Sequence, residues 1–199
     1  MNTIYIFDLI GTLVFSATGT IRGIEKKLDI FGIFVISFLT AVGGGTIRDI
    51  ILNQIPFYFF DINYTVAITL GMLLVILFKD LIKKYNSILI FLDALGLGVF
   101  SIIGATKALN YSLPDIGIVI SGLITGIGGG ILRDVLIKEI PFVLEKEIYA
   151  TASIIGIFLF LILEKSFNVE SELNTWISII LITTIRVVSY KLKVNLPKL

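Results

Sequence analysis

The sequence of 199 residues contains no cysteine and no histidine. Without cysteine the chain can form no disulfide and offers no thiolate nucleophile. Without histidine it lacks the commonest general base and metal ligand at neutral pH, which excludes serine–histidine hydrolysis and histidine-bound zinc. We therefore predict that the protein is not an enzyme and holds no metal ion and no cofactor.

Charged residues are also scarce, at 16% of the chain, whereas soluble domains carry about 25%. Hydrophobic residues make up 56% of the chain, and its mean hydropathy is +1.01. Several apolar runs are long enough for the roughly 20 residues that a helix needs to cross a bilayer. The net charge of +1 is too small for the basic face that binds nucleic acid. The composition therefore predicts an integral membrane protein with no nucleic-acid partner.

The chain carries one unit of sequence twice. Residues 43–49, GGGTIRD, return at 128–134 as GGGILRD, an offset of 128 − 43 = 85 positions. The downstream Ile55-Pro56-Phe57 returns at the same offset as Ile140-Pro141-Phe142. We therefore divide the chain into a first copy at 1–84, a second copy at 85–169 and a tail at 170–199.

The hydropathy pattern predicts an all-α membrane protein with seven transmembrane helices. The expected helices span Ile4–Arg22, Ile30–Ile55, Asp61–Phe78, Ile88–Leu109, Ile116–Ile140, Ile148–Leu163 and Leu173–Ser189. Each copy holds three of them, and an odd number makes the second copy enter the membrane from the opposite side. The copies are then inverted repeats related by a pseudo-two-fold axis in the membrane plane.

The basic residues give the orientation that this helix count implies. Two of them, Lys107 and Lys165, fall on one side of the membrane, and twelve fall on the other. The twelve are Arg22, Lys26, Lys27, Lys79, Lys83, Lys84, Lys138, Lys146, Arg186, Lys191, Lys193 and Lys198. Because cytoplasmic loops carry the excess of lysine and arginine, we expect the N-terminus outside and the C-terminus in the cytoplasm.

We expect the second and fifth helices to be broken at Gly43, Gly44, Gly45 and at Gly128, Gly129, Gly130, respectively. Three successive glycines cost about 1 kcal/mol each relative to alanine, and a break frees backbone groups that lipid cannot satisfy. Each triplet falls near the bilayer midplane, so two matched breaks would form a hydrated constriction. The alternative is that the glycines only allow close helix packing.

Six charges lie inside the predicted helices, where an unpaired charge costs about 2.5–3.5 kcal/mol. They are Asp8, Arg48, Asp49, Asp93, Arg133 and Asp134. We predict ion pairs Asp8–Arg48 in the outer half and Asp93–Arg133 in the inner half. These pairs either contact the permeant species or act as structural locks.

Small hydroxyl side chains near the triplets are candidates to line or gate a pore. They are Ser16, Thr40, Thr46, Ser101, Ser121 and Thr125. The alternative for each is a hydrogen bond back to its own helix. Helix N-termini with nearby arginine favour an anion, whereas freed carbonyls and Asp49/Asp134 favour a cation, so residue types leave the sign of the ion open.

The doubled glycine triplet followed by Arg-Asp and a downstream Pro-Phe resembles the prokaryotic trimeric intracellular cation (TRIC) channels. That family overlaps a bacterial family described as glycine transporters. The resemblance implies a homotrimer in membrane lipid, with one pore in each subunit and helices kinked at the glycine triplets. It also implies that potassium and sodium ions pass.

We predict a potassium-permeable monovalent cation channel, with an ion path inside each protomer that is gated at the glycine kinks. The alternative is a secondary transporter of a small amino acid such as glycine, because inverted repeats with broken helices are common in carriers. Intramembrane proteolysis is disfavoured, because the chain has no histidine and no Gly-x-Gly-Asp segment.

Overall fold

The computed structural model describes residues 3–80, 87–145 and 148–192, and every regular element in these ranges is helical. The long helices are α1 (Thr3–Glu25), α2 (Ile30–Ile51), α3 (Ile62–Leu77), α5 (Ser87–Asn110), α6 (Asp115–Leu136), α8 (Ala150–Ser166) and α9 (Ser171–Leu192). Two short elements follow α2 and α6, namely the 3-10 helix η1 (Phe57–Phe59) and α7 (Phe142–Glu145). Each of these long helices in the described residues overlaps one of the helices predicted from the sequence.

The two copies fold alike at the level of helices and turns. Both bounds of α6 lie 85 positions after those of α2. The turns between helices use left-handed residues at the same offset: Lys27 and Ser112 after α1 and α5, Asn53 and Lys138 after α2 and α6. A left-handed non-glycine residue is uncommon, so its recurrence at matched positions indicates one shared turn chemistry.

The outer surface suits lipid. Five helices, α1, α2, α5, α6 and α9, are long and apolar enough to cross a membrane, while α3 is apolar but has only 16 residues. On α3 the side chains of Leu70, Leu73 and Leu77 are exposed. A monomer in water rarely exposes so continuous an apolar surface. The chain is an integral membrane protein with several spanning helices.

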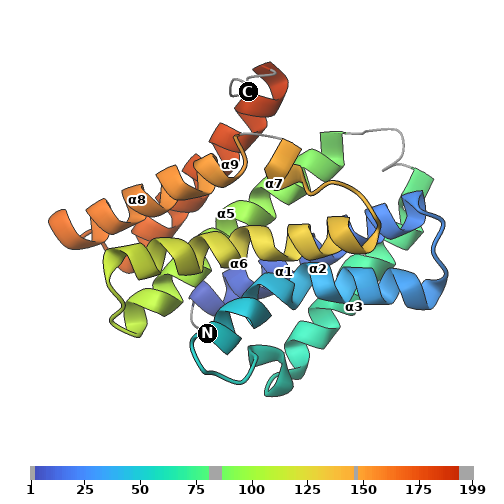
Figure 1. Ribbon diagram of the computed structural model, residues 1–199, viewed down its shortest axis with the longest axis horizontal. Coiled ribbons are helices and arrows are strands. Elements are labelled where there is room, and N and C mark those ends of the chain that lie inside the picture. Colours follow the sequence, from blue (N-terminus) through green and yellow to red (C-terminus); the bar gives the residue numbers. More distant parts are fainter. Residues whose placement is uncertain (1–2, 81–86, 146–147, 193–199) are drawn as a thin grey trace.

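Helices α2 and α6 lie side by side at the centre of the molecule, and α1 and α5 also pack on each other (Figure 1). Helix α3 lies at one edge against α1, and α8 and α9 lie together at the other edge (Figure 1). Helix α9 packs along α5 and α8, whereas α8 contacts α5 much less than α3 contacts α1. The tail therefore inserts a helix into the second copy that has no counterpart in the first.

The predicted breaks at the glycine triplets are wrong. Helix α2 runs without interruption through Gly43–Gly45, and α6 runs without interruption through Gly128–Gly130. All six glycines are buried between the helices. Their low helix propensity is outweighed by tertiary packing, because small residues let two membrane helices approach closely. The alternative, close packing, describes the triplets, and no backbone group is freed there.

Both glycine-containing helices end four residues earlier than predicted, at Ile51 and Leu136. The ends are closed by backbone bonds from the turn, such as Gln54 N to Asp49 O at 2.7 Å. The prolines therefore come after the helix ends and do not cause them. Within the expected basic loops, Lys83, Lys84, Lys146, Lys193 and Lys198 lie outside the described residues.

Candidate functional site

The glycine triplets form the crossing point of α2 and α6. A methyl group added to Gly44 would overlap the carbonyl oxygen of Thr125, and one added to Gly129 would overlap that of Thr40. These two contacts are equivalent at the offset of 85, and together they show that α2 and α6 run antiparallel where they cross. A methyl group on Gly128 would come within 2.9 Å of the Cα atom of Gly44. Nothing as large as a methyl group fits between the two helices at these points.

The ends of the helices show how the copies are oriented relative to each other. The C-terminal ends of α5 and α2 meet where Lys107 Nζ lies 2.8 Å from Asp49 Oδ1. The C-terminal ends of α1 and α6 meet where Lys26 Nζ lies 2.7 Å from Glu139 Oε1. Since α1 and α2 form an antiparallel hairpin, α5 runs opposite to α1. The two copies therefore run in opposite directions through the molecule.

One charge cluster comprises Asp8, Arg48 and Asp49 of the first copy and Lys107 of the second, and we call it the outer cluster after the half of the membrane predicted for Asp8 and Arg48. Arg48 Nε and Lys107 Nζ both lie 2.8 Å from Asp49 Oδ1, and the Arg48 and Asp49 side chains are buried. Asp49 Oδ2 is buried with no hydrogen-bond partner. Asp8 instead accepts a hydrogen bond of 2.8 Å from the hydroxyl of Tyr64.

The predicted Asp8–Arg48 ion pair is wrong, since no such pair occurs among the described residues. Tyr64, on α3, packs against α1 and satisfies one oxygen of Asp8. Arg48 takes its neighbour Asp49 as its partner and also lies over the ring of Phe57 at 5.9 Å from the ring centre. The physical reason is that a hydroxyl from the adjacent helix competes with Arg48 for the carboxylate.

A second cluster, the inner cluster, comprises Asp93, Arg133, Asp134 and Arg186 together with the ring of Tyr149. Arg133 Nη1 lies 3.0 Å from Asp93 Oδ1, and Arg133 Nε lies 2.8 Å from Asp134 Oδ1. The predicted Asp93–Arg133 pair is therefore confirmed. All three side chains are buried, and Asp134 also accepts from the backbone N–H of Phe142 at 3.0 Å.

Several groups of the inner cluster are buried without a hydrogen-bond partner. They are Asp93 Oδ2, Arg133 Nη2, the Tyr149 hydroxyl and Arg186 Nε. The guanidinium of Arg186 lies over the Tyr149 ring, 4.8 Å from its centre. Buried polar groups are normally paired, so this concentration of unpaired ones makes the inner cluster a candidate functional site.

The hydroxyl candidates divide into two groups. Thr40, Thr46 and Thr125 each donate to a carbonyl four residues earlier in their own helix, at 2.6 to 2.8 Å. Ser16, Ser101 and Ser121 bond to a neighbouring helix instead. Their partners are the Ile68 carbonyl, the Ser153 hydroxyl and the Gly104 carbonyl. Among the described residues, the three serine hydroxyls therefore join neighbouring helices, and each of the six hydroxyls has a partner.

The matches to known proteins cover both copies of this architecture. The model of the family described as Glycine transporter matches residues 5–80 and 90–165, one segment in each copy. The chain belongs to this family. A relative from Escherichia coli strain K12, the UPF0126 inner membrane protein YadS, is 38% identical over 196 residues. That similarity covers 98% of this chain and 95% of the relative.

Solved structures extend the likeness to the whole fold. The TRIC trimeric intracellular cation channel orthologue from Rhodobacter sphaeroides gives a TM-score of 0.91 at 30% identity, over 98% of this chain and 100% of that one. A structure of a TRIC cation channel gives a TM-score of 0.87 at 33% identity, over 100% of this chain and 98% of that one. The chain has the TRIC channel fold, and the resemblance inferred from the doubled glycine motif is confirmed.

Four residues in or against the two clusters are not among the predicted site residues: Tyr64, Lys107, Tyr149 and Arg186. From sequence, Lys107 and Arg186 resemble flanking charges, because a basic residue in the last turns of an apolar helix ordinarily reaches the membrane surface. The tyrosines offered one signal, since Tyr64 and Tyr149 lie 85 positions apart.

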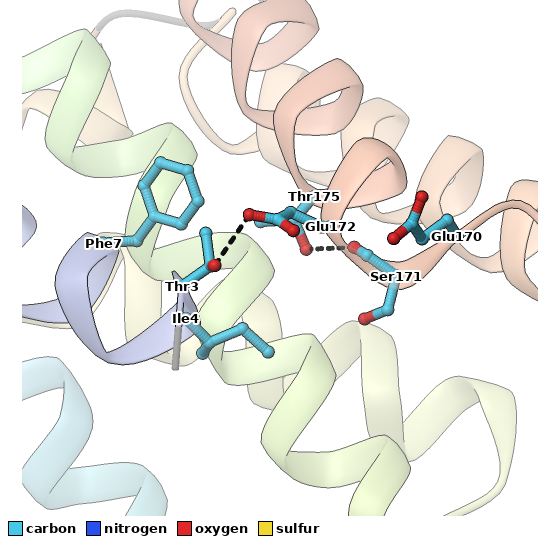
Figure 2. A pocket seen from close by; sticks show the side chains of 7 residues that line it. All are labelled: Thr3, Ile4, Phe7, Glu170, Ser171, Glu172 and Thr175. Atoms are coloured by element: carbon cyan, nitrogen blue, oxygen red, sulfur yellow. Dashed lines mark hydrogen bonds between the residues drawn. The ribbon is translucent and has the colours of Figure 1, made fainter. Parts of the chain in front are cut away.

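A cavity of about 230 Å³ lies where α1 and α9 begin, away from the crossing (Figure 2). Figure 2 shows Thr3 donating to Glu172 across its edge, at 2.7 Å, with Phe7 on one wall. Its seven lining residues are Thr3, Ile4, Phe7, Glu170, Ser171, Glu172 and Thr175. These residues belong to the first five positions of α1 and α9 or directly precede α9, so the cavity lies at one end of the helix bundle.

Proposed function

We propose that the protein is a potassium-permeable monovalent cation channel that assembles as a homotrimer with one ion path inside each protomer. The observation that carries the proposal is the likeness to TRIC cation channels along the entire chain, at TM-scores up to 0.91. Those neighbours are named as trimeric cation channels, and the fold places charge clusters on both sides of a central helix crossing.

The path runs beside the α2–α6 crossing, from the outer cluster to the inner cluster. Each cluster offers a buried carboxylate oxygen with no partner, Asp49 Oδ2 in the outer cluster and Asp93 Oδ2 in the inner cluster. Carboxylate oxygens are suited to replace water around a monovalent cation in a narrow passage. These two atoms therefore favour a cation over an anion as the permeant ion.

We place the gate at the crossing and its surrounding hydroxyls. The closest approaches at the triplets are between backbone atoms, with Leu132 packed against Gly43, so a small slide of α2 against α6 would disturb few side-chain contacts. Such a slide would strain the bond that Ser121 of α6 makes to the Gly104 carbonyl of α5. The Ser121 hydroxyl, with those of Thr40, Thr46 and Thr125 on the same two helices, would then face the path.

We propose seven spans, with the N-terminus outside and the C-terminus in the cytoplasm. Helix α3, at 16 residues, is about 24 Å long at 1.5 Å per residue, which spans a bilayer whose core is thinned locally to match. The inverted direction of the copies and the excess of basic residues at one end support this orientation.

A planar-bilayer recording of purified protein under a potassium chloride gradient tests the proposal. We expect unitary currents whose reversal potential lies near that of potassium. A reversal potential near that of chloride would reject cation selectivity, and saturable flux without current would reject a channel altogether.

The second candidate is a carrier of glycine, which the description of the matching family favours. Counterflow of radiolabelled glycine into proteoliposomes separates the two. A carrier accumulates label when unlabelled glycine is loaded inside, whereas a cation channel gives the same uptake with and without internal glycine.

A further inference from the structure

We infer that Arg186, a residue of the seventh long helix α9, lowers the preference of the inner half of the path for cations over anions. The inference rests on the proposed function and adds to it a specificity-determining residue outside both copies of the repeat. Its guanidinium is the second cation of the inner cluster and reduces the attraction of that cluster for potassium.

The position of Arg186 differs from that of a flanking basic residue. Its side chain is only 5% exposed, although it stands in the C-terminal half of α9. It stacks on Tyr149, and Tyr149 also lies within electrostatic reach of Asp93 and Arg133. Tyr149 therefore links the positive charge of Arg186 to the Asp93–Arg133 ion pair.

The two clusters have equal charge balances but reach them differently. Asp8, Arg48 and Asp49 sum to −1, and Lys107 brings the outer cluster to zero. Asp93, Arg133 and Asp134 also sum to −1, and Arg186 brings the inner cluster to zero. Lys107 comes from within the repeat, whereas Arg186 comes from the added helix.

The two balancing cations also differ in their surroundings. Lys107 is 29% exposed on its side chain and is bonded to Asp49, so its charge is neutralised locally and partly screened by solvent. Arg186 is buried, its Nε has no partner, and it forms no ion pair among the described residues. A buried unpaired cation is costly, and its field extends farther than that of a paired one.

A simpler explanation is that Arg186 only anchors α9 by stacking on the Tyr149 ring, since cation–π contacts stabilise helix packing on their own. That explanation predicts a change in stability but no change in ion preference. Arg186→Met keeps an apolar contact with the ring and removes the charge, whereas Arg186→Lys keeps the charge and loses the planar stack.

The test is the reversal potential of wild type, Arg186→Gln, Arg186→Met and Arg186→Lys channels under one potassium chloride gradient. We expect a rise of roughly threefold or more in the potassium-to-chloride permeability ratio for the Gln and Met variants, because a nearby unit charge is removed from a poorly screened site. We expect the wild-type ratio for Arg186→Lys. Lys191→Gln, which removes an exposed charge from the same helix, is the matched control and should leave the ratio unchanged.

The outcomes separate this inference from the proposed function. Wild-type current with an unchanged ratio in both neutral variants would overturn the inference and leave the channel proposal intact. If both neutral variants fail to give monodisperse protein while Arg186→Lys gives it, the role of Arg186 is structural, and the inference is again overturned. The absence of current from the wild type would overturn the proposed function and this inference together.

Discussion

The two copies have the same turns, and the bounds of α2 and α6 match, and yet the side chains of their charge clusters make different contacts. In the first copy Tyr64 donates to Asp8, and the ion pair of Arg48 is with its neighbour Asp49. In the second copy the equivalent Tyr149 hydroxyl has no hydrogen-bond partner among the described residues, and Arg133 bridges Asp93 and Asp134. The same motif therefore makes different contacts in two places of one molecule.

The difference follows from α9. In the first copy α3 packs along α1, so Tyr64 reaches the carboxylate on α1. In the second copy α9 packs against α5 and holds α8 away from it. Tyr149, the residue before α8, stays within electrostatic reach of Asp93 on α5 but makes no hydrogen bond of normal geometry to it, and Asp93 pairs with Arg133. The two equivalent carboxylates therefore differ: Asp8 accepts from a tyrosine hydroxyl, whereas Asp93 lies in a buried ion pair.

The largest expected effect comes from removing the carboxylate charge in each copy. Asp93→Asn breaks a buried ion pair and should cost about 3–5 kcal/mol of unfolding free energy. Asp8→Asn keeps an oxygen that accepts from Tyr64 and should cost only about 1 kcal/mol. Equilibrium unfolding in mixed micelles measures both.

Equal losses in the two variants would contradict the comparison. Tyr64→Phe is the control for the first copy, because it removes the hydroxyl that donates to Asp8 while leaving the carboxyl group in place. It should destabilise the protein at least as much as Asp8→Asn does.

A second prediction concerns what the copies have in common. Gly44→Ala and Gly129→Ala place a methyl group against a backbone carbonyl at equivalent points of the crossing. Because a backbone atom in a packed helix cannot move aside, each should cost about 1–3 kcal/mol, and the two costs should be similar. Thermal denaturation in detergent, followed by the monodisperse fraction, measures the loss.

The third glycine of each triplet sharpens the contrast between copies. A methyl group on Gly45 would meet the Phe57 ring at 2.6 Å, whereas on Gly130 the nearest atom is the Tyr149 hydroxyl oxygen at 3.4 Å. Gly130→Ala is therefore the matched control and should be tolerated, while Gly45→Ala should destabilise. The opposite order would show that Phe57 moves more freely than the packing indicates.

Sequence predicted the positions of the helices and the doubling, because residues 43–49 and 128–134 are almost identical and helix length is limited by the bilayer. It did not predict that α2 and α6 stay unbroken. Local propensity makes a glycine triplet a poor helix, and only the partner helix, 85 positions away in sequence, explains why it persists. The glycine triplets can be read from the sequence, but the packing of α2 against α6, which turns a predicted break into a close helix contact, cannot.

The ion pairs illustrate the same limit at the level of single residues. Matched positions predicted both Asp8–Arg48 and Asp93–Arg133, and only the second pair forms. The two sites differ because of α9, which belongs to the tail and therefore lies outside the part of the chain that the repeat covers. Arg186 was counted as a flanking charge because nothing in its neighbourhood of α9 indicates the Tyr149 ring above which it lies.

The smallest expected effect concerns the turns that follow α2 and α6. Glu139, after α6, bonds to Lys26 at the end of α1, whereas the equivalent Gln54, after α2, carries no charge. The hydrogen bond from Lys26 holds the pKa of Glu139 below its ordinary value of 4.5. A carboxylate with a lowered pKa in the folded state stabilises the protein above its unfolded pKa, and this contribution is lost as the pH falls through the folded pKa.

Acidification from about pH 4.5 downward should therefore loosen the α1–α6 contact, by less than about 1 kcal/mol as is usual for a partly exposed pair. Glu139→Gln should remove this acid-side component of the unfolding free energy and leave stability above pH 6 slightly lower. Gln54→Glu is the reciprocal change, and because the position equivalent to Lys26 is Tyr111, it should create no such component. If Gln54→Glu gained the same acid-side dependence, the charge asymmetry between the two ends of the molecule would not arise from Lys26.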